Sequence, residues 1–140
     1  MTQEEKELLL KDLFGRLPYG VKCCARFNTG SRYTANVTAI CADRDYIETR
    51  QNDLHPYRGS SVEDIRLYLR PMSSMTEEEK KEFDEVIKSC NNKVFVCPAQ
   101  ERRYIFFDAE QEDFMNAHHF DYRGLIEKGL ALEAPEGMYI

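Results

Sequence analysis

The stretch that decides the fold is YTANVTAICA, residues 33–42. It is rich in β-branched residues, and its apolar side chains occupy every second position, at Tyr33, Ala35, Val37, Ala39 and Cys41. Successive side chains of a strand point to opposite faces of the sheet. This period of two therefore predicts a strand with one buried face.

Shorter segments with strand character lie on both sides of it, at residues 21–27, 46–50 and 65–69. Residues 61–64 are predicted to form a single helical turn. Turn-forming residues such as Asn28-Thr29-Gly30-Ser31 separate them. Several short strands with polar turns are typical of small barrels, because closing a sheet removes its exposed edges. We predict a small SH3-like β-barrel over residues 19–71; the alternative is a strongly bent antiparallel sheet packed by flanking helices.

Two capping boxes predict a helix on each side of this segment. Thr2 with Glu5 opens a helix over residues 2–14, which Gly15 would end. Thr76 with Glu79 opens a second one over residues 77–90. The acidic first turn of that second helix is explained by the helix dipole alone.

A hairpin and a third helix are predicted further along the chain. Residues 93–97 and 103–107 have strand character, and the segment between them, which begins at Pro98, would join them as a hairpin. Asp108 with Gln111 repeats the capping-box spacing and opens a helix through about Ala117. The fold class is therefore α+β. We expect two units packed as one globular body, residues 1–75 with the N-terminal helix and barrel, and residues 76–140 with a helix–hairpin–helix arrangement.

Composition and the N-terminal sequence indicate where in the cell the protein is located. The 140 residues include no apolar run close to the roughly 20 residues that span a bilayer, and the N-terminus is acidic where a signal peptide would be basic. The five cysteines are an odd number without a CxxC pair. Reduced thiols that act as small hydrophobes are therefore expected, and a cytoplasmic location is predicted.

Charge is distributed unevenly along the chain, which has a net charge of −6. Residues 15–72 carry nine Lys and Arg against six acids, whereas residues 73–140 carry eight against fifteen. Arginine and tyrosine alternate in the basic middle, a pairing used for phosphate contact, base stacking and protein–protein contacts. The predicted binding residues are Arg44, Arg50, Arg66, Arg70, Tyr46 and Tyr68. Three interpretations stay open: charge spread without a common face, a protein-binding face, and a nucleic-acid-binding face that the acidic pI of about 5.1 disfavours.

One cluster has residue types that suit a metal ion. His118, His119 and Asp121 offer two imidazoles and a carboxylate, which are ligands for Zn²⁺ and other transition metals. Adjacent residues of a helix point about 100° apart, so at most one histidine could converge with Asp121. The alternative interpretation is a histidine pair that stabilises the last carbonyls of a helix. These three residues are weak metal candidates, and no metal or cofactor is predicted.

Motifs of known catalytic classes are absent from the sequence. It contains no G-x-S-x-G, no P-loop and no GxGxxG, and nothing connects Cys23 or Cys24 to a nearby base. Whether the protein is an enzyme is left undecided, with a lean toward a non-enzyme. The rival hypothesis is a metal-assisted hydrolase that uses His118 or His119 with Asp121.

Three stretches together resemble a known group of proteins: residues 16–22 (RLPYGVK), residues 62–76 (VEDIRLYLRPMSSMT) and residues 120–132 (FDYRGLIEKGLAL). The combination is similar to a family of small uncharacterised proteins encoded by phages and prophages of gut Bacteroides-type bacteria. The resemblance implies a mobile-element origin and brings no catalytic residues with it. The leading hypothesis is a non-enzymatic phage or prophage accessory protein that binds a host or phage macromolecule, most simply a protein.

Overall fold

The first helix, α1 (Gln3–Arg16), begins at the predicted capping box. The computed structural model describes residues 1–41, 43, 45–89, 94–97, 102–105 and 109–139. The Thr2 hydroxyl accepts from the Glu5 N–H, and the Glu5 carboxylate accepts from the Thr2 N–H. The prediction that Gly15 ends this helix is wrong, because α1 continues to Arg16. A Cβ at Gly15 would lie 2.9 Å from the Asn116 side-chain nitrogen, so glycine permits a close approach there instead.

A six-stranded sheet forms the larger part of the fold. Its strands are β1 (Lys22–Arg26), β2 (Arg32–Cys41), β3 (Tyr46–Arg50), β4 (Arg58–Ser60), β5 (Arg66–Leu69) and β8 (Ala131–Glu133), in the order β4-β3-β2-β1-β5-β8. The first five pair antiparallel, and β8 joins β5 in parallel. The alternation of residues 33–42 therefore predicts β2 correctly, whereas the short strands β4 and β8 were not expected.

The α+β class is confirmed, but the SH3-like barrel over residues 19–71 is not. The sheet is not closed into a barrel, since its order runs from a β4 edge to a β8 edge. β5 already has β1 on one side and β8 on the other, so neither of its edges is left to receive β4. The outcome is closer to the alternative of an antiparallel sheet with flanking helices, extended by one parallel strand.

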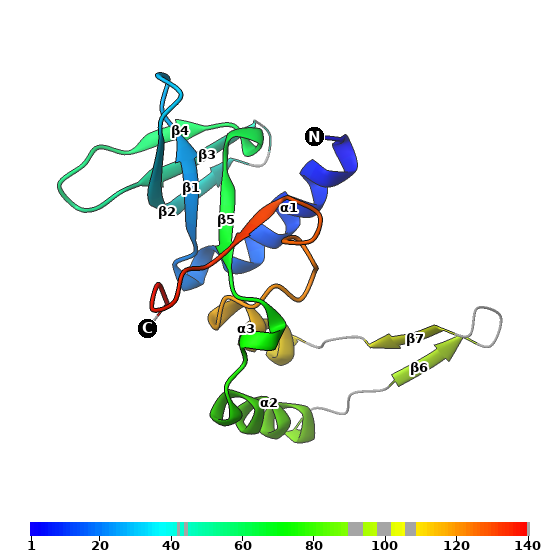
Figure 1. The fold of residues 1–140 in the computed structure, drawn as a ribbon. Coiled ribbons are helices and arrows are strands. Elements are labelled where there is room, and N and C mark those ends of the chain that lie inside the picture. The colour runs from blue at the N-terminus through cyan, green and yellow to red at the C-terminus, as the bar shows by residue number, and fades with distance from the viewer. Residues whose placement is uncertain (42, 44, 90–93, 98–101, 106–108, 140) are drawn as a thin grey trace.

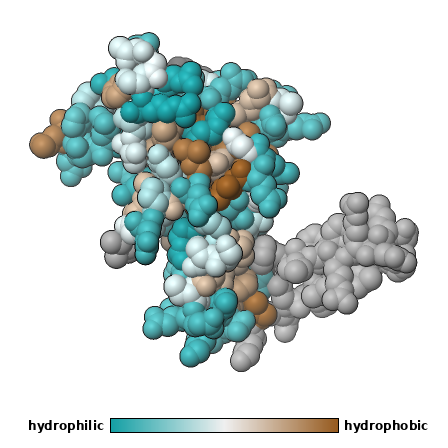
Figure 2. Space-filling view, viewed as in Figure 1, coloured by the Kyte–Doolittle hydropathy of each residue, from teal (hydrophilic) through white to brown (hydrophobic). Residues whose placement is uncertain are grey.

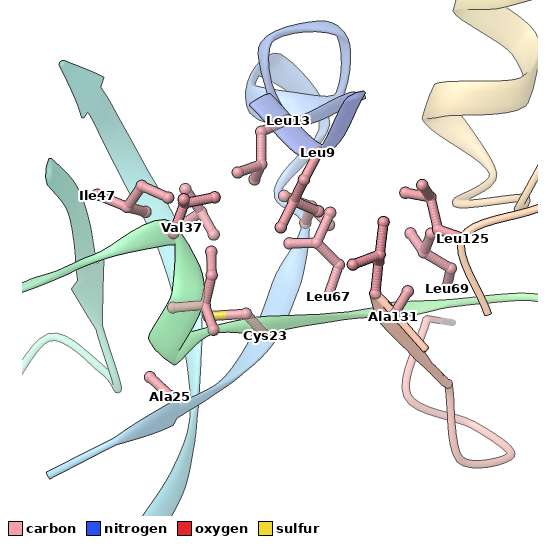
Figure 3. Close-up of a cluster of buried hydrophobic side chains, with 14 of the residues drawn as sticks. Leu9, Leu13, Cys23, Ala25, Val37, Ile47, Leu67, Leu69, Leu125 and Ala131 are labelled. Carbon is pink, nitrogen blue, oxygen red and sulfur yellow. The ribbon is translucent and has the colours of Figure 1, made fainter. Parts of the chain in front are cut away.

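The core lies between α1 and one face of this sheet. Leu9 and Leu13 of α1 are fully buried against sheet residues that include Val37 and Leu67. Figure 3 shows these side chains directed toward one another from the helix and the strands. Buried residues alternate with half-exposed or exposed ones in β5 and along most of β2, as a sheet with one covered face requires. In β1 the three consecutive residues Cys23, Cys24 and Ala25 are all buried.

The remaining helices lie at one end of the sheet. α3 (Ala109–Ala117) lies between the sheet and α2 (Glu77–Ser89) in Figure 1. Phe83 of α2 and Phe114 of α3 have ring centroids 5.2 Å apart. The predicted hairpin is formed by β6 (Val94–Cys97) and β7 (Arg102–Ile105), while Asp108, the expected cap of α3, lies outside the described residues. Short 3₁₀ turns, η1 (Leu17–Tyr19), η2 (Val62–Asp64) and η3 (Met72–Ser74), connect the larger elements.

Candidate functional site

The sheet has one face turned away from α1, called here the outer face. Cys23 and Ala25 of β1 belong to the core, so their neighbours Lys22, Cys24 and Arg26 lie on the other side. Cross-strand pairing carries this alternation to the neighbouring strands. The outer face is thus defined by these residues: Lys22, Cys24 and Arg26 of β1, Arg32, Thr34 and Asn36 of β2, Tyr46, Glu48 and Arg50 of β3, and Arg66 and Tyr68 of β5.

Positive charge gathers on this face. It carries five cationic side chains from four strands: Lys22, Arg26, Arg32, Arg50 and Arg66. The acid among the outer-face residues defined above is Glu48, whose carboxylate accepts from the Thr38 hydroxyl at 2.9 Å. In Figure 2, hydrophilic residues cover most of the visible surface of the coloured part of the molecule. The cations of the basic middle segment therefore do share a face in part.

Three of these arginines line one small hollow. Arg26 and Arg32 are exposed cross-strand partners beside the β1–β2 turn, and Arg66 reaches the same hollow from β5. Glu63 and Asp64 also line it, and Glu63 forms an ion pair of 2.9 Å with Lys6 of α1. That ion pair lowers the pKa of Glu63. The hollow is therefore a mixed-charge surface with an excess of guanidinium groups.

Arg50, a predicted binding residue, holds the loop between β3 and β4. Its guanidinium donates to the carbonyls of His55 and Asp53 at 3.0 and 2.8 Å and to the Tyr57 hydroxyl at 3.1 Å. It also lies 4.5 Å from the centroid of the Tyr57 ring. Arg66 likewise donates to backbone carbonyls, those of Glu63 and Ile65, at 3.1 and 2.8 Å. Both guanidinium groups are thus oriented by backbone oxygens. Arg50 also forms a long ion pair of 3.9 Å with the exposed Asp53 carboxylate, whereas no ion pair joins Arg66 to a described residue.

Arg70, the predicted residue at the end of β5, has a different environment. Its guanidinium forms two hydrogen bonds of 2.8 and 2.7 Å with the Glu79 carboxylate of α2 and lies 4.3 Å from the Phe120 ring centroid. The bond to Arg70 is the main cause that lowers the pKa of Glu79 to about 2. Arg70 therefore joins the sheet to α2, and its charge is neutralised within the protein.

The remaining predicted binding residues have different surroundings. Tyr46 is 43% exposed and packs over Gly59 of β4, where a Cβ would meet the tyrosine ring. Tyr68 lies half-buried on the outer face, and its carbonyl accepts from the Tyr139 hydroxyl at 2.7 Å. Arg44 lies outside the described residues. Of the predicted set, the fold thus places Arg50, Arg66, Tyr46 and Tyr68 on one face.

The three weak metal candidates do not converge. Nδ1 of His118 lies 3.1 Å from the Glu79 carboxylate, and the ring packs against Phe114. Both Asp121 oxygens accept backbone N–H groups, from Leu125 at 2.8 Å and Ile126 at 3.0 Å, so this carboxylate closes a turn. His119 is buried and stacks on Tyr139. Across the part of the chain that the structure describes, no group of three His, Cys, Asp or Glu side chains is placed to hold a metal ion.

The binding prediction omitted Lys22, Arg26 and Arg32, although all three share the outer face with Arg66. A signal for Arg26 and Arg32 was present. They lie on either side of the predicted turn at residues 28–31, so a hairpin across that turn brings them close together, and the register pairs them. No comparable local signal places Lys22 or Arg66, because the pairing of β1 with β5 joins segments about 40 residues apart in the chain.

Fold and site together define an α+β protein with a basic face on an open mixed sheet. A comparison with protein-family models, curated proteins and solved structures finds no match to this chain. None of the helices in the described ranges combines the length and the apolar character needed to cross a bilayer.

Proposed function

We propose that this protein is a non-enzymatic binding protein that holds an acidic segment of another protein on its outer face. The observation that supports the proposal is the register of the sheet, which aligns Arg26, Arg32 and Arg66 on one side of three strands. Guanidinium groups suit this role, since each presents a planar set of donors to a carboxylate. Arg26 and Arg32 are exposed, and no ion pair joins either of them to a described residue.

Charge elsewhere in the chain favours a protein partner over a nucleic acid. The whole molecule carries −6, with most of the negative charge after residue 72, so a long polyanion would be repelled at a distance. A short acidic peptide is different because it can be confined to the outer face. The resemblance to phage and prophage proteins would make the partner a host or phage protein in a bacterial cytoplasm.

The test measures binding of a fluorescent peptide rich in Glu and Asp by anisotropy at low and at moderate salt. The variant Arg26→Glu/Arg32→Glu should weaken binding at least about tenfold, because two contact charges are reversed. The matched control is Lys11→Glu/Lys128→Glu, which alters net charge equally at two exposed positions outside the sheet. Its affinity should stay within about threefold of the wild type.

Two results would reject the proposal. Equal losses in both double variants would mean that net charge, and not the outer face, governs binding. Tighter binding of a labelled single-stranded oligonucleotide than of the peptide, lost in Arg26→Glu/Arg32→Glu, would assign the same face to nucleic acid.

A further inference from the structure

A cleft of about 360 Å³ lies where the start of β1, the end of β5, the end of α3 and the C-terminal segment meet. Its polar walls come from side chains far apart in the sequence: Tyr19, Lys22, Arg70, His118, His119 and Tyr139. No Asp or Glu is among the described residues that line it. The walls are thus made of cations, imidazoles and phenols, which is the composition of an anion-binding surface.

The backbone at His119 is the first sign that its side chain has a role. α3 ends in a Schellman-type arrangement, in which the His119 N–H donates to the Asn116 carbonyl and the Phe120 N–H donates to the Met115 carbonyl. His119 has φ = 63°, in the left-handed region where such a position usually holds glycine. Every other residue with positive φ in the described part of the chain is a glycine. A histidine here is therefore not what the turn itself favours.

The imidazole of His119 is held in place, but one of its two ring nitrogens is buried without a hydrogen-bond partner. Its ring stacks on Tyr139 at a centroid distance of 3.6 Å and an interplanar angle of 15°. The Tyr139 hydroxyl is fixed in turn, since it accepts from the Lys22 N–H at 2.9 Å and donates to the Tyr68 carbonyl at 2.7 Å. The His119 side chain is 8% exposed, and its Nδ1 is buried without a hydrogen-bond partner. Buried polar atoms nearly always have a hydrogen-bond partner, so the unpaired Nδ1 is consistent with a position that a ligand occupies.

The neighbouring groups that lower the pKa of His119 are basic side chains, and two of them, Arg16 and Arg70, are paired with carboxylates. Arg16 of α1, Lys22 of β1, Arg70 of β5 and the neighbouring His118 all disfavour its protonated form. Burial is the larger cause, and together these effects lower the pKa of His119 to about 4. Glu79 neutralises Arg70 and contacts His118, whereas no ion pair joins Lys22 to a described residue. The uncompensated charge at the cleft is therefore that of Lys22.

We propose that this cleft is a binding site for an oxyanion, a carboxylate or phosphate group of a small ligand, held by the Lys22 ammonium and the His119 imidazole. The imidazole can donate from the nitrogen that carries its proton, and Lys22 supplies a full charge. The site is separate from the hollow formed by Arg26, Arg32 and Arg66, so it does not depend on the proposed function. An anion beside His119 favours the imidazolium, so binding should raise the pKa of His119 and take up protons.

The experiment titrates the full-length protein with inorganic phosphate and, in a separate arm, with acetate, in a buffer without other multivalent anions. Imidazole signals in long-range ¹H–¹⁵N spectra report the site directly, and calorimetry supplies the affinity. Lys22→Gln and His119→Asn should each weaken binding at least about tenfold. Asparagine is chosen because it tolerates the left-handed backbone better than most residues. Lys128→Gln, an exposed lysine elsewhere, is the matched control and should bind like the wild type.

The two arms distinguish the source of the anion. Preference for phosphate points to a phosphorylated ligand, and preference for acetate points to a carboxylate. Absence of saturable binding in both arms, or affinities that Lys22→Gln leaves unchanged, would overturn the proposal. Should His119→Asn fail to fold by circular dichroism, Lys22→Gln decides the question alone. Arg26→Glu/Arg32→Glu must retain the anion site, so failure here and failure of the proposed peptide-binding function give different results.

Discussion

Two groups of arginines in this protein show opposite uses of the same side chain. Arg16 of α1 is fully buried and donates to Asp12, also fully buried, at 2.6 and 3.1 Å, and to the Phe120 carbonyl at 2.6 Å. Arg26 and Arg32 on the outer face are exposed cross-strand neighbours without ion pairs to the described residues. The first arrangement holds α1 to the chain around residue 120, whereas the second leaves charge available at the surface.

The difference shows that position, and not residue type, decides what an arginine does. Burial removes the water that would solvate the Arg16 charge, so its carboxylate partner becomes essential. At the outer face water solvates the guanidinium groups, so these arginines need no carboxylate partner and their charge contributes little to the stability of the fold. Arg70 is intermediate, since its side chain is 20% exposed and its Glu79 partner 13% exposed. The loss in free energy of unfolding, when each arginine or its partner is replaced, should therefore be largest for the most buried arginine and smallest for the exposed ones.

The largest effect is expected at Asp12. Asp12→Ala leaves the Arg16 charge buried without its partner and also removes the 3.1 Å contact from Arg123. The free energy of unfolding should fall by about 3–5 kcal/mol, measured by urea denaturation. Lys11→Ala, at the exposed position beside it, is the control and should change this value by less than about 0.5 kcal/mol. A loss below about 1 kcal/mol for Asp12→Ala would contradict the assignment of Arg16 to the buried group.

The next effect is a pH dependence that originates at His119. Its pKa is about 4 in the folded protein and about 6.5 in the unfolded chain, so the unfolded state binds the proton first as the pH falls. Stability should therefore decrease between pH 6.5 and pH 4, by up to about 3 kcal/mol from this group. Urea titrations of the wild type and His119→Asn over this range measure it. The wild type should lose more stability than the variant, and parallel pH profiles would refute the prediction.

A smaller effect is expected at Glu79, where a neighbouring charge favours the ionised form, whereas burial disfavours it at His119. Its pKa is lowered from 4.5 to about 2, chiefly by Arg70, so its contribution is complete above pH 4.5 and disappears as the pH falls toward 2. Glu79→Gln should lower stability by about 2 kcal/mol at pH 7, and the gap to the wild type should close in that acidic window. Glu78→Gln, exposed in the same helical turn, serves as the comparison and should show no such gap.

The smallest effect is expected on the outer face. Arg26→Gln and Arg32→Gln should each change the free energy of unfolding by less than about 0.5 kcal/mol, because both side chains are exposed. Together they should weaken peptide binding while thermal unfolding is unchanged. A stability loss comparable to that of Asp12→Ala would erase the distinction between the two groups of arginines.

Local elements were predictable from the sequence to within a few residues. The capping boxes at Thr2 and Thr76 start α1 and α2 as expected, because a cap depends on residues three positions apart. The alternation from Tyr33 predicts β2, since one buried face imposes a period of two. β8 escaped prediction because its three residues form a strand only by pairing in parallel with β5, more than sixty residues earlier in the chain.

The candidate site was predicted only in part for the same reason. Arg50 and Arg66 were identified by residue type, and the fold does place both on the outer face. Arg70 was chosen on the same grounds, yet the neighbouring helix α2 supplies the carboxylate that neutralises it. His118 and His119 were weak metal candidates, at most one of which could converge with Asp121. The structure instead directs His118 toward Glu79 and stacks His119 on Tyr139.

The sequence by itself determined the helices, most of the strands and the uneven distribution of charge, because these depend on neighbours within a few positions. Only the tertiary structure decided which arginines are buried, which share a face and which polar atoms lack partners. Those outcomes depend on contacts such as Arg16 with the Phe120 carbonyl, which joins residues 104 positions apart. No local pattern encodes such a contact, since it exists only after the sheet has brought both ends of the chain together.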